Sequence, residues 1–168
     1  MKNSVITAKS DRKLCILFGT LSFCALLAAY ISEFMGYKPC ILCIYQRVPY
    51  FIILFAALII YFFKPNYIIL RYTKYLITTL LVIEFGIAFY HVLIEHHIIA
   101  ETASCQTQLL IKEDIEKTLE LIRSQEATSC AKPELFILGL STAEWNCLYS
   151  LCLFVYSFRF RGFDATRR

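Results

Sequence analysis

The sequence predicts an all-α, polytopic membrane protein in which four transmembrane helices form a single bundle, one membrane domain over residues 1–168. The chain is 58% hydrophobic, has a mean hydropathy of +0.59 and contains only five glycines, a composition that does not suit an ordinary soluble domain. Four apolar runs are close to the length that a helix needs to cross a bilayer. Basic residues gather on alternate connections between these runs, which is the charge pattern of a multi-span protein.

The four predicted spans cover about 14–31, 44–63, 75–94 and 144–160. Backbone polar groups in a bilayer must be bonded within the protein, so each run is predicted to be helical. The first run could instead be a cleaved signal peptide, because basic residues precede it and alanines lie within it. We favour a span, since the apolar core is long for a signal and three more spans follow.

The 17 Lys and Arg residues are distributed unevenly between the two sides of the predicted bundle. Eleven lie before the first span, between the second and third, or after the fourth, whereas six share the other side with most of the acids. Positively charged loops stay in the cytoplasm, so both termini are predicted to be cytoplasmic and the loops at about 32–43 and 95–143 to face the other compartment. The net charge of +4 therefore reflects topology, and no basic patch interleaved with aromatic residues predicts binding to nucleic acid.

A Cys-x-x-Cys motif, Cys40 to Cys43, stands at the mouth of the second span. Pro39 disfavours helix just before it, and the apolar residues from Ile44 onward favour helix, so the cysteines should occupy the first helical turn. The unpaired amides and positive dipole end of a first turn lower a cysteine pKa, because they stabilise the thiolate. Arg47 follows Cys43 by four residues and puts a fixed positive charge on the same helix face.

The other six cysteines fall into two groups. Cys105 and Cys130 lie in the long outer loop, where an oxidising compartment favours a disulfide between them. That disulfide could be a structural staple or an exchangeable pair, and the residues alone leave both readings open. The remaining four lie within spans and are predicted to pack in the core as small hydrophobic side chains: Cys15, Cys24, Cys147 and Cys152.

A short amphipathic helix is predicted in the same loop, between the two cysteines. Apolar residues recur there at helical spacing, with charged residues on the other faces: Ile111, Ile115, Leu119 and Ile122. Such a helix would lie on the membrane surface and hold the loop close to the Cys-x-x-Cys motif. The alternative is a helix that merely packs on the bundle.

Two ionisable residues share one face of the third span. Glu84 lies near its middle, and His91, seven residues later, lies near its outer end. Ionisable groups within a membrane are costly and indicate function by default, although Glu84 could simply be protonated and hydrogen-bonded to a tyrosine or serine on a neighbouring helix. His91 should lie at about the depth of Cys43 and Arg47, which makes it a candidate site residue.

Residues 38–47 (Lys-Pro-Cys-Ile-Leu-Cys-Ile-Tyr-Gln-Arg) resemble the signature of the DsbB family of bacterial disulfide bond formation proteins. Residues 90–95 resemble a family motif at the end of the third span, and residues 138–146 resemble the lead into the fourth. Cys105 and Cys130 match the second redox pair of the family. The likeness covers nearly the whole chain after the N-terminal tail, although the connection at 64–74 contributes nothing to it and no family role attaches to Glu84.

The resemblance implies a quinone-dependent, disulfide-generating oxidoreductase of the bacterial inner membrane, with its redox loops in the periplasm. It implies that a periplasmic thioredoxin-fold dithiol oxidase similar to DsbA gives electrons to the long-loop pair, which passes them to the Cys-x-x-Cys motif and then to ubiquinone or menaquinone. Arg47 and His91 are the residues expected to bind a quinone from the membrane pool. The implied catalytic residues are Cys40, Cys43, Cys105 and Cys130.

Two other classes of function could use these residues. A soft-metal protein would use thiolates and imidazoles as ligands, drawn from Cys40, Cys43, His91, His96, His97, Cys105 and Cys130. Exposed cysteine pairs would tend to oxidise in the outer compartment, and a route through the bilayer would offer only Glu84, so we expect no metal site. A purely structural four-span scaffold is the other class, and it leaves Arg47 unexplained.

Overall fold

The computed structural model describes residues 2–63, 65–100, 129–131 and 135–165. Cys105 and the predicted amphipathic helix lie outside these residues. Nearly all of the described chain belongs to four long helices: α1 (Lys2–Phe34), α2 (Ile41–Phe63), α3 (Tyr67–Glu95) and α6 (Thr142–Ala165).

Three of these helices contain segments long and apolar enough to cross a membrane, namely Asp11–Phe34, Ile41–Phe63 and Tyr67–Glu95. Large apolar side chains stay exposed on their outer faces, such as Phe55 and Phe62 of α2, as a lipid-facing surface requires. The prediction of a multi-pass helical membrane protein is therefore confirmed. The helix α6 is a fourth long helix where the sequence places a fourth span, and its crossing of the bilayer stays a prediction.

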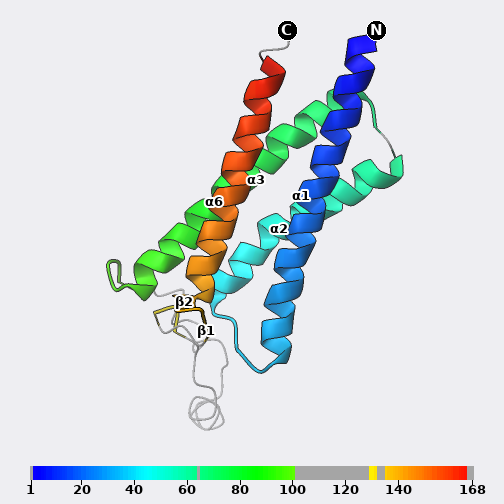
Figure 1. The fold of residues 1–168 in the computed structure, drawn as a ribbon. Helices are drawn as coiled ribbons and strands as arrows, with labels where there is room; N and C mark the ends of the chain where they lie inside the picture. The colour runs from blue at the N-terminus through cyan, green and yellow to red at the C-terminus, as the bar shows by residue number, and fades with distance from the viewer. Residues whose placement is uncertain (1, 64, 101–128, 132–134, 166–168) are drawn as a thin grey trace, which may run out of the picture.

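The helices form a bundle in which α1 and α6 run in opposite directions, with both chain ends at the same end (Figure 1). The helix α1 packs against α2 and α3, and α6 packs against α3. The Tyr149 hydroxyl of α6 donates to the Leu21 carbonyl of α1 at 2.9 Å. A hydrogen bond of 2.7 Å between the Thr78 and Ser157 hydroxyls joins α3 to α6. The connection from α1 to α2 lies at the end away from the termini.

A glycine sets how closely α1 and α2 approach each other. A Cβ atom added at Gly19 would lie 2.2 Å from the Cβ of Ala57, a separation that real Cβ atoms do not reach. The small pair therefore lets the two backbones come together, as small residues do between membrane helices. Around it, buried apolar side chains such as Phe18, Ile53 and Leu81 fill the core.

The helix α3 begins at Tyr67, earlier than the predicted span of 75–94. Asn66 precedes it in an extended conformation (φ −61°, ψ 158°). The early turns carry Lys74, whose Nζ donates to the Asp11 carboxylate of α1 at 2.7 Å. Both side chains are largely buried, with exposures of 14% and 6%, and each neutralises the other's charge. Asp11 and Lys74, which both fall outside the predicted spans, are thus accommodated inside the bundle.

A two-stranded hairpin precedes α6 and departs from the all-α prediction. Its strands β1 (Phe136–Ile137) and β2 (Leu140–Ser141) pair antiparallel. Leu138 and Gly139 connect them with φ of 54° and 86°, the left-handed conformation of a two-residue hairpin turn. Strands of two residues are too short to leave an alternating pattern in the sequence. The Trp145 indole donates to the Ile137 carbonyl at 2.8 Å and fastens the hairpin to α6.

The start of α6 is fixed by a reciprocal cap. The Glu144 amide donates to the Ser141 hydroxyl at 3.1 Å, and the Ser141 amide donates to the Glu144 carboxylate at 2.8 Å. The Ser141 hydroxyl also donates to Glu95 at the end of α3. The ends of α3 and α6 are therefore held together beside the Cys-x-x-Cys motif.

Candidate active site

Cys43 lies in the first turn of α2, as the sequence predicts, whereas Cys40, which is predicted for the same turn, lies immediately before the helix. The Ile44 amide donates to the Cys40 carbonyl at 3.2 Å, so Cys40 occupies the capping position of the helix. The two cysteines are thiols whose sulfur atoms lie 3.1 Å apart, and the Cys43 amide donates to the Cys40 sulfur at 3.4 Å. The motif is thus held at the helix start with both sulfurs on one side.

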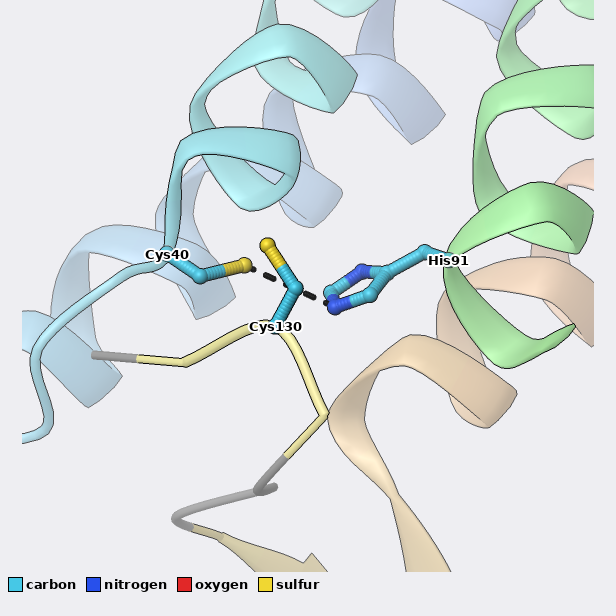
Figure 2. Close-up of side chains that lie close together, drawn as sticks. All are labelled: Cys40, His91 and Cys130. Atoms are coloured by element: carbon cyan, nitrogen blue, oxygen red, sulfur yellow. Dashed lines mark hydrogen bonds between the residues drawn. The ribbon is translucent and has the colours of Figure 1, made fainter. Parts of the chain in front are cut away.

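Cys130 and His91 complete a buried cluster with Cys40 (Figure 2). The Sγ atoms of the two cysteines and a ring nitrogen of His91 all lie within 4.8 Å of one another. The His91 Nε2 atom is 3.5 Å from the Cys40 sulfur. Exposures of 7% for Cys40 and 2% for both Cys130 and His91 show that the three side chains are largely shielded from solvent. A cysteine far away in the sequence therefore lies beside the first cysteine of the motif.

The surroundings of Cys40 favour its protonated form. A hydrogen bond with Cys130 lowers the pKa of Cys40, but the hydrogen bond with Cys43 and burial outweigh it, and the pKa is raised to about 12. In the reduced protein Cys40 therefore keeps its proton at neutral pH. The helix start alone would lower a thiol pKa, so here the neighbouring sulfur and burial dominate.

Two polar side chains orient His91. The amide nitrogen of Gln46 lies 3.4 Å from Nδ1, and a Glu95 carboxylate oxygen lies 3.9 Å from Nε2. Gln46 follows Cys43 by three residues and Glu95 follows His91 by four, so each shares a helix face with a predicted site residue. This spacing could have identified both residues from the sequence.

Arg47 has an acidic partner that the sequence analysis did not identify. Its Nη1 atom donates to the Glu33 carboxylate in the last turns of α1 at 2.7 Å. The guanidinium also lies over the Tyr30 ring, 4.7 Å from the centroid. Its Nε atom is buried and has no hydrogen-bond partner within the described part of the chain. One donor of a charged group therefore remains available beside the motif.

A cavity of about 430 Å³ opens between the helices at this end of the bundle. Cys40, Cys43, Arg47, His91 and Cys130 all line it, together with small apolar residues of α1. Its size falls within the range of small-molecule binding sites, and the surface of its walls is mostly apolar, although several polar side chains contribute to it. Five of the six predicted site residues are therefore gathered around one cavity, and the sixth, Cys105, lies outside the described residues.

Glu84 belongs to a separate polar chain that reaches the cavity. Its carboxylate, fully buried, accepts a hydrogen bond from the Asn146 amide of α6 at 2.8 Å. The Tyr50 hydroxyl of α2 donates to the other side of Asn146 at 2.9 Å. Tyr50 and Asn146 line the cavity, whereas Glu84 does not. Asn146 thus links Glu84 of α3 to Tyr50 of α2. Glu84 is bonded to a neighbouring helix, but its partner is an asparagine and not the predicted tyrosine or serine.

The four cysteines predicted to lie in the core differ in position. Cys15 is buried and Cys147 is half-buried, as expected. Cys24 and Cys152 are exposed, so the core prediction is wrong for these two. A thiol behaves as a small hydrophobe and is therefore compatible with an apolar, membrane-facing surface as well as with the core.

Three cysteines gathered at one end of a helical membrane bundle, beside an apolar cavity, define a membrane protein of thiol–disulfide chemistry. Residues 11–159 match the model of the family described as disulfide bond formation protein DsbB, and the chain belongs to that family. It is a membrane protein of disulfide bond formation.

Two relatives extend this comparison. An uncharacterized protein of Rickettsia prowazekii (strain Madrid E) is 33% identical over 153 residues, which cover 88% of this chain and 87% of the relative. The disulfide bond formation protein B of Acinetobacter baumannii (strain ATCC 17978) is 31% identical over 129 residues, 75% of each chain.

Proposed function

We propose that this chain is a membrane thiol:quinone oxidoreductase that reoxidises a periplasmic thioredoxin-fold dithiol oxidase of the DsbA kind. Electrons pass from Cys105 and Cys130 to Cys40 and Cys43, and from there to ubiquinone or menaquinone. The single observation that carries the proposal is the position of Cys130, whose buried sulfur lies within 4.8 Å of the Cys40 sulfur. Thiol–disulfide exchange needs such an approach, because the attacking thiolate must reach one sulfur of the disulfide directly.

The exchange balances as a series of thiolate attacks. A thiolate of the reduced partner attacks Cys105 in the Cys105–Cys130 disulfide, which forms a mixed disulfide and releases Cys130 as thiolate. Cys130 then attacks Cys40 in the Cys40–Cys43 disulfide, and Cys43 leaves as thiolate. The second thiol of the partner resolves the mixed disulfide, so the partner departs oxidised and Cys105 becomes a thiolate. Cys105 attacks Cys130, restores the long-loop disulfide and leaves Cys40 and Cys43 reduced.

The cavity fits a quinone at the point where these electrons arrive. Cys43, Arg47 and His91 line it, and the buried Nε–H of Arg47 is a donor without a partner among the described residues. A charged donor directed at a carbonyl oxygen stabilises negative charge that develops there. A quinone bound in the cavity would accept the two electrons and two protons released when the Cys40–Cys43 disulfide forms again.

In the proposed topology α6 is the fourth span, both termini are cytoplasmic, and the protein lies in the bacterial inner membrane. Two observations support it. The start of α1 and the end of α6 lie at one end of the bundle, and the start of α2, which follows Cys40, lies at the other (Figure 1). The basic residues are concentrated in the segments assigned to the cytoplasmic side. The partner oxidase would then meet the long loop in the periplasm, where its own disulfide is needed.

A disulfide-trapping experiment tests whether Cys130 lies close enough to Cys40 to exchange with it. In the double variant Cys43→Ser/Cys105→Ser, Cys40 and Cys130 have lost their usual partners and should form a disulfide with each other. Peptide mapping by mass spectrometry without reduction should find that linkage in most of the purified protein. The matched control, Cys43→Ser/Cys130→Ser, leaves Cys40 and Cys105 and should form far less of any linkage. Equal yields in the two variants would contradict a direct path from Cys130 to Cys40.

A further inference from the structure

The cluster of Cys40, His91 and Cys130 is also an arrangement of soft metal ligands (Figure 2). Each residue offers one ligand atom, the three atoms lie within 4.8 Å of one another, and all three side chains are buried. They come from three separate parts of the chain, namely the start of α2, the outer end of α3 and the segment before β1. All three belong to the seven candidate ligands scattered along the sequence, and the fold brings these three together.

The spacing suits a tetrahedral zinc ion. Zinc lies about 2.3 Å from a cysteine sulfur and about 2.0–2.1 Å from a histidine nitrogen, so two ligands at the tetrahedral angle are roughly 3.5–3.8 Å apart. The Cys40 sulfur and the His91 Nε2 atom are already 3.5 Å apart. The cluster therefore needs only a small movement of Cys130 to surround an ion.

We propose that the reduced form of this protein binds one thiophilic divalent cation, such as Zn²⁺, through Cys40, Cys130 and His91. Both thiols give up a proton to the solvent on binding, since thiolate is the ligand form. Three protein ligands leave a fourth position for water on the cavity side. The oxidised form does not bind the cation, because its sulfurs are held in disulfides. This agrees with the expectation that cysteines in an oxidising compartment form disulfides and do not bind metal.

Gln46 would act on the metal through His91. A metal-bound imidazole donates its other N–H to a nearby acceptor, which fixes the ring and its tautomer. The Gln46 amide lies 3.4 Å from Nδ1, and turning this amide about its last bond presents its carbonyl oxygen to an Nδ1–H. Nε2 is then free of its proton and directed at the cysteines. The partner that a metal-binding histidine requires is therefore already present.

The consequence for activity rests on the proposed function. An ion held by Cys40 and Cys130 occupies the two sulfurs that must exchange, so it should arrest the enzyme in its reduced form until a chelator removes it. The binding itself rests only on the geometry of three side chains. Binding and catalysis can therefore be tested separately.

The binding test uses the full chain in detergent, reduced and freed of reductant without oxygen, and titrated with Co²⁺ as a coloured substitute for zinc. We expect one equivalent to bind with thiolate-to-cobalt absorption, and Zn²⁺ to displace it. Cys130→Ser and His91→Gln should each weaken binding by more than about 100-fold, and Gln46→Ala by roughly tenfold. The double variant Cys24→Ser/Cys152→Ser, which removes two exposed thiols, should bind like the wild type.

Three results would overturn the proposal. Undiminished binding in Cys130→Ser or in His91→Gln would place the ion elsewhere, and so would loss of binding in the Cys24/Cys152 control. Binding by the oxidised protein with equal affinity would also contradict it. No quinone or partner is present in the titration, so a positive result with an inactive enzyme would reject the proposed function and leave the metal site standing. If the enzyme is active but binds no cobalt, the metal site would be rejected and the proposed function would stand.

Discussion

Arg47 and Glu33 form an ion pair of 2.7 Å that joins the second turn of α2 to the end of α1 at the rim of the cavity. The arginine side chain is only 13% exposed, whereas the glutamate is 42% exposed. A half-exposed ion pair adds little stability, so its main effect is to fix the direction of the guanidinium. With an Nη1 donor bonded to Glu33 and the ring of Tyr30 close to the guanidinium, the buried Nε–H is a donor that has no partner among the described residues and is left for a ligand.

Substitution of Arg47 should affect quinone binding through charge. Arg47→Gln removes a charge-assisted interaction of about 1.5–3 kcal/mol, which corresponds to a roughly tenfold to hundredfold higher apparent KM for quinone. Arg47→Lys keeps the charge and should retain more activity. Steady-state kinetics over a range of quinone concentrations would measure both effects.

The matched control for Arg47→Gln is Glu33→Gln, which removes the negative charge of the half-exposed Glu33 and leaves the Arg47 guanidinium in place. Because exposed pairs contribute about 0–1 kcal/mol, the KM should rise less than about fivefold. A loss as large as that of Arg47→Gln would mean that the ion pair, and not a contact with quinone, is what Arg47 supplies.

Alkylation of Cys40 in the reduced protein should report its raised pKa. With a pKa of about 12, the thiolate fraction and the iodoacetamide rate should still climb about tenfold per pH unit from pH 8 to pH 10. Mass spectrometry of the labelled peptide would follow Cys40 by itself. Cys43→Ala should move the profile to lower pH and Cys130→Ala to higher pH, because their hydrogen bonds have opposite effects. An alkylation rate that levels off between pH 9 and pH 10 in the wild type would show that Cys40 ionises normally.

The cysteines away from the cluster should be dispensable. Replacing Cys15, Cys24, Cys147 and Cys152 together by alanine should leave thiol-dependent quinone reduction within about twofold, since none of them belongs to the two proposed redox pairs. Cys24 lines the cavity, and alanine keeps that part of its wall small and apolar. Any loss should appear as lower thermal stability caused by the buried Cys15. A folded quadruple variant without activity would show that a fifth cysteine takes part.

Two glycines offer a paired test of helix packing. Gly19→Ala should lower the free energy of unfolding in detergent by about 1–3 kcal/mol, because its Cβ would collide with Ala57. Gly86→Ala, in the middle of α3, meets nothing within 4 Å and should be neutral or stabilising by up to about 1 kcal/mol. Equal effects at the two positions would contradict the close approach of α1 and α2.

What the sequence could predict here is local. Pro39 followed by an apolar run was enough to put Cys40 and Cys43 at the start of α2, because helix ends depend on neighbouring residues. The depth of His91 in the third span was enough to bring it near the motif. These inferences need only helix periodicity and a bilayer of known thickness.

The partners of these residues depend on how the helices rotate against one another, which a single sequence does not specify. Glu33 bonds to Arg47 because of the way α1 packs against α2. Asn146 bonds to Glu84 because of the way α6 packs against α3. The hairpin before α6 was not predicted for a different reason: strands of two residues are too short to show a periodic pattern in the sequence.

The central claim is that electrons pass from a partner dithiol through two cysteine pairs to quinone. The most direct measurement gives purified protein in detergent a reduced thioredoxin-fold dithiol and a soluble quinone analogue, and follows the quinone absorbance. Our account predicts quinone reduction that requires the dithiol and is abolished in each single variant, Cys40→Ser, Cys43→Ser, Cys105→Ser and Cys130→Ser. Folded wild-type protein that consumes no quinone, or a Cys43→Ser variant that consumes it at the wild-type rate, would contradict the account.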